Sequence, residues 1–184
     1  YNNYSGSYDT VDALVIGNGN WGMDEDSDIY YYNQCKNVTI DNNVVNAKGH
    51  NLIYAISVAA ENAFINNNNV TAVSDVHYAD AIQIHGPSSG IVIEENDLEI
   101  EAPNLAFGLY AYAYMAPIED VIFCDNNIEA TAYAACGMEI VGSNFTISDN
   151  IVELTGNYTT GIVGDIDGGK IIGNAIYALG SNNG

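Results

Sequence analysis

A short pattern of apolar and polar residues recurs along the chain. Two apolar residues stand one position apart, an asparagine follows three positions later, and another apolar residue comes two positions after it. The asparagines of these copies lie 24 to 30 residues apart. They are, in chain order, Asn18, Asn43, Asn68, Asn96, Asn126, Asn150 and Asn174. The first and last copies are weaker matches than the five between them.

A second apolar pair recurs 12 to 14 residues after each asparagine, as at Ile82 and Ile84 after Asn68. Alternation with a period of two predicts strands, and no segment shows the sustained apolar stripe of a helix. Strands this short bury an apolar face only by stacking on their equivalents in the next repeat. The sequence therefore predicts an all-β fold, a right-handed parallel β-helix (solenoid) of about seven coils. Residues 1–184 would form a single domain, either complete or part of a longer solenoid or polymer.

The repeated asparagine has two properties that suit such a fold. Asparagine adopts the left-handed αL conformation more readily than any residue except glycine, which suits a bend between strands. Stacked asparagine amides can also hydrogen-bond from coil to coil. We therefore expect the asparagines to form one column along the axis.

The copy at residues 37–45, with the sequence NVTIDNNVV, resembles the right-handed β-helix repeats of carbohydrate-active and secreted proteins. It looks especially like the asparagine-rich adhesin-like surface proteins of archaea. The resemblance extends over nearly the whole chain and implies the β-helix fold. It says little about function, because this solenoid carries lyases, hydrolases, epimerases and inert stalks alike.

The charge of the chain restricts its partners. There are 24 acidic residues against three lysines and no arginine, a formal net charge of −21. Such a surface repels nucleic acid and anionic membranes, and it has almost no cation with which to hold a polyanionic substrate. Cations, neutral glycans and other protein chains remain. The longest apolar stretch, residues 105–118, contains Gly108 and Pro117, so we expect no membrane insertion.

The register of the second strand in each repeat predicts one outward-facing surface. It should bring together Gln83, His85, Tyr110, Tyr112 and Glu139 as a ligand-binding platform for a sugar. An exposed tyrosine-rich sheet without a ligand, or a protein contact, explains the same pattern. If the protein is an enzyme, the acid–base candidates are Asp80, His85 and Glu139.

Two further kinds of site are suggested by short motifs. Asp24, Asp26 and Asp28 place carboxylates at alternate positions of a loop, which could hold calcium, although the loop departs from the EF-hand pattern. A solvated acidic loop is the alternative, and we expect no other cofactor. Five sequons for N-glycosylation occur, at Asn3, Asn37, Asn69, Asn144 and Asn157. Three cysteines without a CxxC motif indicate either idle thiols or an intermolecular bridge.

Few lysines and many asparagines, glycines and tyrosines suggest an extracellular or cell-surface location. The leading interpretation is a non-catalytic structural protein, such as an adhesin-like, surface-layer, sheath or filament component. Its main partner would be itself, through head-to-tail stacking or lateral assembly. The alternative is a β-helix that binds or cleaves a neutral polysaccharide.

Overall fold

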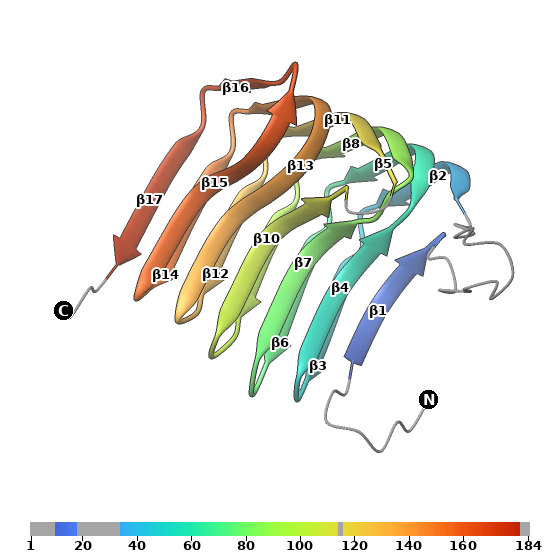
Figure 1. The fold of residues 1–184 in the computed structure, drawn as a ribbon. Coiled ribbons are helices and arrows are strands. Elements are labelled where there is room, and N and C mark those ends of the chain that lie inside the picture. The colour runs from blue at the N-terminus through green and yellow to red at the C-terminus, as the bar shows by residue number, and fades with distance from the viewer. Residues whose placement is uncertain (1–9, 18–33, 114–115, 181–184) are drawn as a thin grey trace, which may run out of the picture.

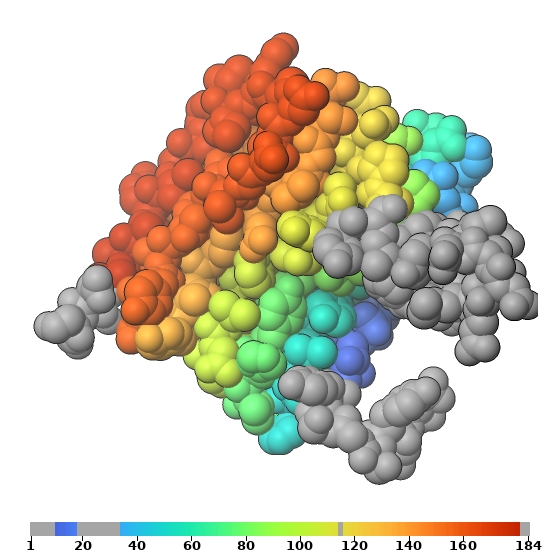
Figure 2. Space-filling view, in the orientation of Figure 1, coloured from blue at the N-terminus to red at the C-terminus, as the bar shows by residue number. Residues whose placement is uncertain are grey.

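The computed structural model describes residues 10–17, 34–113 and 116–180. These residues form a parallel β-solenoid of about six turns, which confirms the all-β solenoid fold and comes close to the seven coils expected. Figure 1 shows the strands of successive coils side by side, from β1 in blue to β17 in red. In Figure 2 the coils form successive bands of colour across the surface.

Each coil contributes a strand to three faces, and every strand pairing is parallel. Face A consists of β1 (Thr10–Ile16), β4 (Leu52–Val58), β7 (Tyr78–Ile84), β10 (Leu105–Tyr112) and the first parts of β13 (Ala134–Ser148) and β15 (Tyr158–Asp167). Face B consists of β2 (Cys35–Asp41), β5 (Ala60–Asn66), β8 (Ser88–Glu94), β11 (Ile118–Cys124), the second part of β13 and β16 (Lys170–Ile172).

Face C is a separate six-stranded sheet. It consists of β3 (Val44–Gly49), β6 (Asn69–Ser74), β9 (Asp97–Glu101), β12 (Asn127–Thr131), β14 (Ile151–Gly156) and β17 (Ala175–Gly180). Faces A and B are joined into one sheet because β13 passes from one face to the other without a break, pairing with both β10 and β11. The chain therefore winds A, B, C in every coil.

The first coil differs from the one expected. The repeat assigned Ala13 and Val15 to the strand that leads to a column asparagine, which is a face B strand. In the structure Val15 lies opposite Ser57, so β1 belongs to face A. Each face accordingly has six coils, and the assignment of residues 13–18 is corrected. Asn18 itself lies outside the described residues.

The interior is filled by small and branched apolar side chains in stacked rows. One such row on face A contains Ile56, Ile82, Leu109 and Met138, all with 0% exposure. Each row is continuous from coil to coil, so no coil can bury its inner face without its neighbours. This dependence is the reason a solenoid folds as a stack.

Face A has two adjacent inward-facing positions, which interrupt the normal alternation. In β7 these are Ala81 and Ile82, both fully buried. In β13 the first of the two is Gly137, where an added Cβ would lie 2.6 Å from Cγ1 of Val152 in the core and 2.5 Å from the carbonyl oxygen of Gly161. Two inward positions in succession bend the strand, as a β-bulge does. The outward rows on either side of this bend carry the candidate site.

The αL bends do not lie at the column asparagines but one residue earlier. The residues concerned have φ between 51° and 71°, and they are Asn42, Asn67, Glu95, Asp125, Asp149 and Gly173. A second αL column, also with positive φ, crosses face B at Asn37, Asn62, Gly90, Asp120, Asn144 and Gly168. These two columns account for much of the asparagine, aspartate and glycine in the repeat, because these residues tolerate αL best.

Candidate functional site

The asparagines of the repeat form one hydrogen-bonded column at the corner between faces B and C. The backbone N–H and the side-chain Nδ2 of each residue donate to Oδ1 of the asparagine one coil further on, at 2.8 to 3.1 Å. The described members are Asn43, Asn68, Asn96, Asn126, Asn150 and Asn174.

Each amide in the interior of the column also binds the coil before it. Nδ2 of Asn68 donates to the carbonyl oxygen of Ile40 at 2.9 Å, and Nδ2 of Asn126 donates to that of Ile93 at 3.0 Å. Asn68 and Asn126 are 1% and 2% exposed. One side chain thus connects three coils, which makes the column a structural element with its polar atoms satisfied.

The outer surface of face A brings the predicted platform residues together. Tyr110 lies opposite Gln83 on one side and Glu139 on the other. Tyr112 lies two residues along the same strand, 39% exposed, and its ring stacks on that of Tyr110 with centroids 6.0 Å apart. Three neighbouring coils therefore present an amide, a phenol and a carboxylate in one row.

The platform continues into aromatic rings that the repeat pattern did not identify. Rings follow one another in edge or tilted contact, with centroid distances of 5.4 to 5.8 Å between successive partners. The series runs Tyr54, Tyr78, Phe107, Tyr110, and Tyr112 extends it. We call these five residues the tyrosine surface. The signal for it was present in the sequence, because Tyr54 and Phe107 occupy the same position of their strands as Asp80.

Asp80 lies beneath the tyrosine surface with no exposed area. Tyr78 donates its hydroxyl proton to Oδ2 of Asp80 at 2.7 Å, whereas Oδ1 is buried without a hydrogen-bond partner. Burial raises the pKa of Asp80 well above its usual value, the hydrogen bond from Tyr78 lowers it, and the charge of Glu139 raises it further. Burial also raises the pKa of Tyr54 to about 12, with the charge of Asp80 adding to the effect.

Asp80 and Glu139 come from strands that both pair with β10, so they are two coils apart and in different rows. One dry and one partly solvated carboxyl on a single surface is the arrangement that general acid–base chemistry uses. Asp80, however, has no exposed surface and cannot contact a glycosidic oxygen in this conformation. His85 directly follows β7, and burial lowers its pKa, which favours the neutral imidazole.

The remaining predicted sites fall outside face A. Asp24, Asp26, Asp28 and the sequon at Asn3 lie outside the described residues. Among residues 10–17, 34–113 and 116–180, no group of three or more His, Cys, Asp or Glu side chains could hold a metal ion. The other sequon asparagines, Asn37, Asn69, Asn144 and Asn157, all have exposed side chains.

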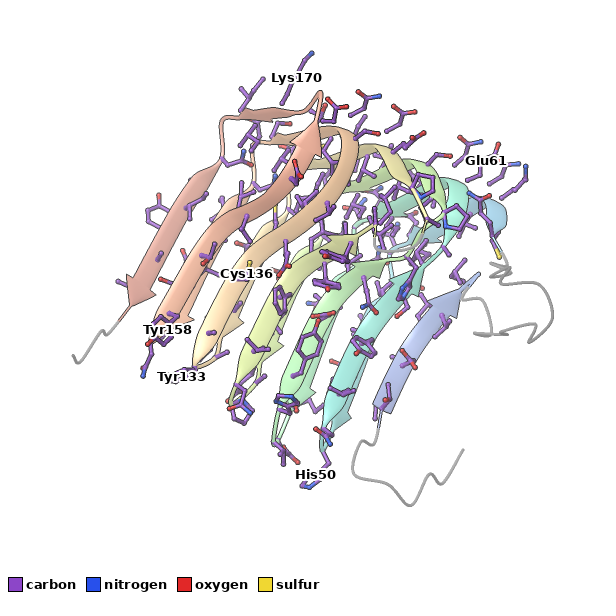
Figure 3. The ribbon with its side chains drawn as sticks, in the orientation of Figure 1. His50, Glu61, Tyr133, Cys136, Tyr158 and Lys170 are labelled. Carbon is purple, nitrogen blue, oxygen red and sulfur yellow. The ribbon has the colours of Figure 1, made fainter. Side chains whose placement is uncertain are left out.

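The three cysteines are unpaired and differ in exposure. Cys35 on face B is exposed, Cys124 is partly buried, and Cys136, labelled in Figure 3, is buried in the row of Asp80. Burial raises the pKa of Cys124 and of Cys136 to about 12. Of the three, Cys35 is the thiol best placed for an intermolecular bridge.

Comparison with known proteins found no match among family models, curated proteins or solved structures. Within the described part of the chain, no helix is long and apolar enough to cross a membrane. The functional argument therefore rests on the geometry of this solenoid.

Proposed function

We propose that this protein is an extracellular structural component that assembles with copies of itself by head-to-tail stacking of solenoids. The observation that supports this most is the exposed apolar surface of the last described coil. Ile171 is 55% exposed and Ile176 is 42% exposed, whereas their partners one coil earlier, Ile147 and Val152, are completely buried. A further coil in register would bury both.

The polarity of the asparagine column suits the same arrangement. Every asparagine donates toward the C-terminal end of the stack and accepts from the N-terminal end. Asn43 and Asn174 are the first and last members among the described residues, so the two ends of the column offer complementary groups. A head-to-tail contact between copies is heterologous and extends into a filament when it does not close.

The composition supports a location outside the cell. Three lysines, the high content of asparagine and tyrosine and the exposed sequons suit a displayed, glycosylated surface. The resemblance to adhesin-like surface proteins of archaea points the same way, toward a surface layer, a sheath or a filament.

The solution state of the 184-residue chain tests this proposal. We expect size-exclusion chromatography with light scattering to show end-to-end species that grow with concentration, and electron microscopy to show them as fibres. Ile176→Asp places a charge on the proposed contact and should abolish them. Ile122→Asp is the matched control, because Ile122 is 41% exposed but lies on β11 in an interior coil. A folded monomer at all concentrations, or equal effects of the two substitutions, would contradict head-to-tail assembly.

A second candidate function is the binding or cleavage of a neutral polysaccharide on face A. It is favoured by the row of Gln83, Tyr110 and Glu139, which pairs hydroxyl-binding groups with a ring that can stack on a sugar. Screening against neutral polysaccharides tests it. Turnover that is lost in Glu139→Gln would overturn the non-catalytic interpretation.

A further inference from the structure

Asp80 lacks a partner that its environment requires. A buried carboxyl oxygen without a hydrogen bond is costly, and native proteins rarely leave one unsatisfied. Oδ1 of Asp80 is such an atom, while Oδ2 already accepts from Tyr78. The missing partner is therefore a hydrogen-bond donor or a cation.

The charges around this atom favour a cation. The carboxyl of Glu139 acts on Asp80, and that of Asp12 acts on Tyr54, so three acidic groups surround one set of rings. The lysines of the chain do not balance them. Lys36 is on β2 and binds Glu61, Lys48 is on β3, and Lys170 is on β16. Figure 3 shows Lys170 and Glu61 far from Cys136, which marks the row of Asp80.

The lining of the site favours an organic cation over a metal ion. Tyrosine and phenylalanine faces attract ammonium and methylammonium groups through their ring quadrupoles but provide no metal ligands. Tyr54, Tyr78 and Tyr110 are only partly buried, so their rings border solvent. Rotation of these side chains would open a path to the carboxyl of Asp80.

We propose that the tyrosine surface binds an organic ammonium group, with Asp80 and Glu139 as its counter-charges. The ammonium group lies against the rings of Tyr54, Tyr78 and Tyr110 and occupies the unpartnered side of Asp80. Binding exchanges a cation for a proton: the carboxyl of Asp80 ionises as the ammonium group arrives, and the proton is released to solvent. The ligand is a small amine or a sugar that carries one.

Isothermal titration calorimetry of the full chain at fixed ionic strength tests the proposal. The probes are choline and its neutral isostere 3,3-dimethylbutan-1-ol, which has the same shape without the charge. We expect choline to bind at least about ten-fold more tightly than the isostere, a ratio within the range of desolvated cation–π contacts. Glucosamine and N-acetylglucosamine, titrated in parallel, distinguish a sugar-borne ammonium group from a free one.

Three variants separate a built site from general attraction to an acidic protein. Asp80→Asn preserves the acceptor for Tyr78 and should weaken choline binding about ten-fold, and Tyr110→Leu should weaken it several-fold. Glu129→Gln removes one charge from face C and should leave it unchanged. Titrations in buffers of different ionisation enthalpy should show proton release for the wild type and none for Asp80→Asn.

Several results would overturn the inference. They are equal affinity for choline and the isostere, no choline binding at millimolar concentration, and an equal loss in Glu129→Gln and Asp80→Asn. Binding of a neutral oligosaccharide without binding of choline would also overturn it, and would support the second candidate function instead.

Discussion

Replacing Asn68 by aspartate should destabilise the solenoid far more than the same change at its neighbour Asn67. Nδ2 of Asn68 donates to the carbonyl oxygen of Ile40 and to Oδ1 of Asn96, each at 2.9 Å. An aspartate oxygen in this place faces two acceptors and donates to neither. Asn67 is exposed, has a φ of 51° and tolerates aspartate, which also adopts αL.

The size of the effect follows from the two lost bonds. Leaving a buried polar group without its partner costs about 1 to 3 kcal/mol, so Asn68→Asp should lose about 2 to 6 kcal/mol. This is a large part of the 5 to 15 kcal/mol that is typical for a domain. Asn67→Asp adds the same charge at the surface, where substitutions usually change stability by less than about 0.5 kcal/mol.

Urea unfolding followed by far-ultraviolet circular dichroism measures both variants against the wild type. We expect the midpoint of Asn68→Asp to fall markedly and that of Asn67→Asp to stay close to the wild type. Acid should partly rescue Asn68→Asp, because a protonated carboxyl regains one donor. Equal midpoints for the two variants would mean that the amide column does not hold the coils together.

Three further predictions concern single acidic residues. Burial raises the folded-state pKa of Asp80 above its unfolded value, so the native state binds its proton more tightly and stability falls as pH rises between the two values, by up to about 1.4 kcal/mol per unit. Asp80→Asn should remove this dependence in thermal unfolding at a series of pH values; an unchanged profile would show that Asp80 ionises freely. Glu129 lies between Glu99 and Glu153 in register on face C, so Glu129→Gln should raise the melting temperature at low salt, and an effect that persists in 1 M salt would argue against charge repulsion. Glu95 has a φ of 55° where other coils have Asn, Asp or Gly, so Glu95→Asn should stabilise by about 1 kcal/mol in urea unfolding, and a loss would show that its side chain has a compensating contact.

The repeat spacing was sufficient to predict most of the architecture. It identified the column asparagines and placed Gln83, Tyr110 and Glu139 in one row, because parallel strands in register align equivalent residues. It misplaced the first coil, because alternation with a period of two suits a strand on any face. The long connection between β1 and β2, residues 17–34, also breaks the regular spacing.

Two features of the structure depend on geometry that alternation does not encode. The αL bend belongs to the residue before each column asparagine, since the asparagine itself must direct its amide along the axis. The burial of Asp80 depends on rings from the neighbouring coils, Tyr54 and Phe107, and on the bend at Ala81 and Ile82 that turns their rows toward one another. A strictly alternating strand would have left Asp80 on an open surface.

Faces A and C share the same interior and the same solvent, yet their outer rows differ. On face C the outward row contains Glu99, Glu129 and Glu153, charged side chains in register that keep a sheet soluble without recognising a partner. On face A the equivalent positions carry aromatic rings above a dry carboxyl. Solubility does not require that arrangement, and stacking of coils does not require it either, because the amide column and the apolar rows are common to every coil. The difference between the two faces therefore assigns stability and assembly to the repeat, and recognition to the tyrosine surface.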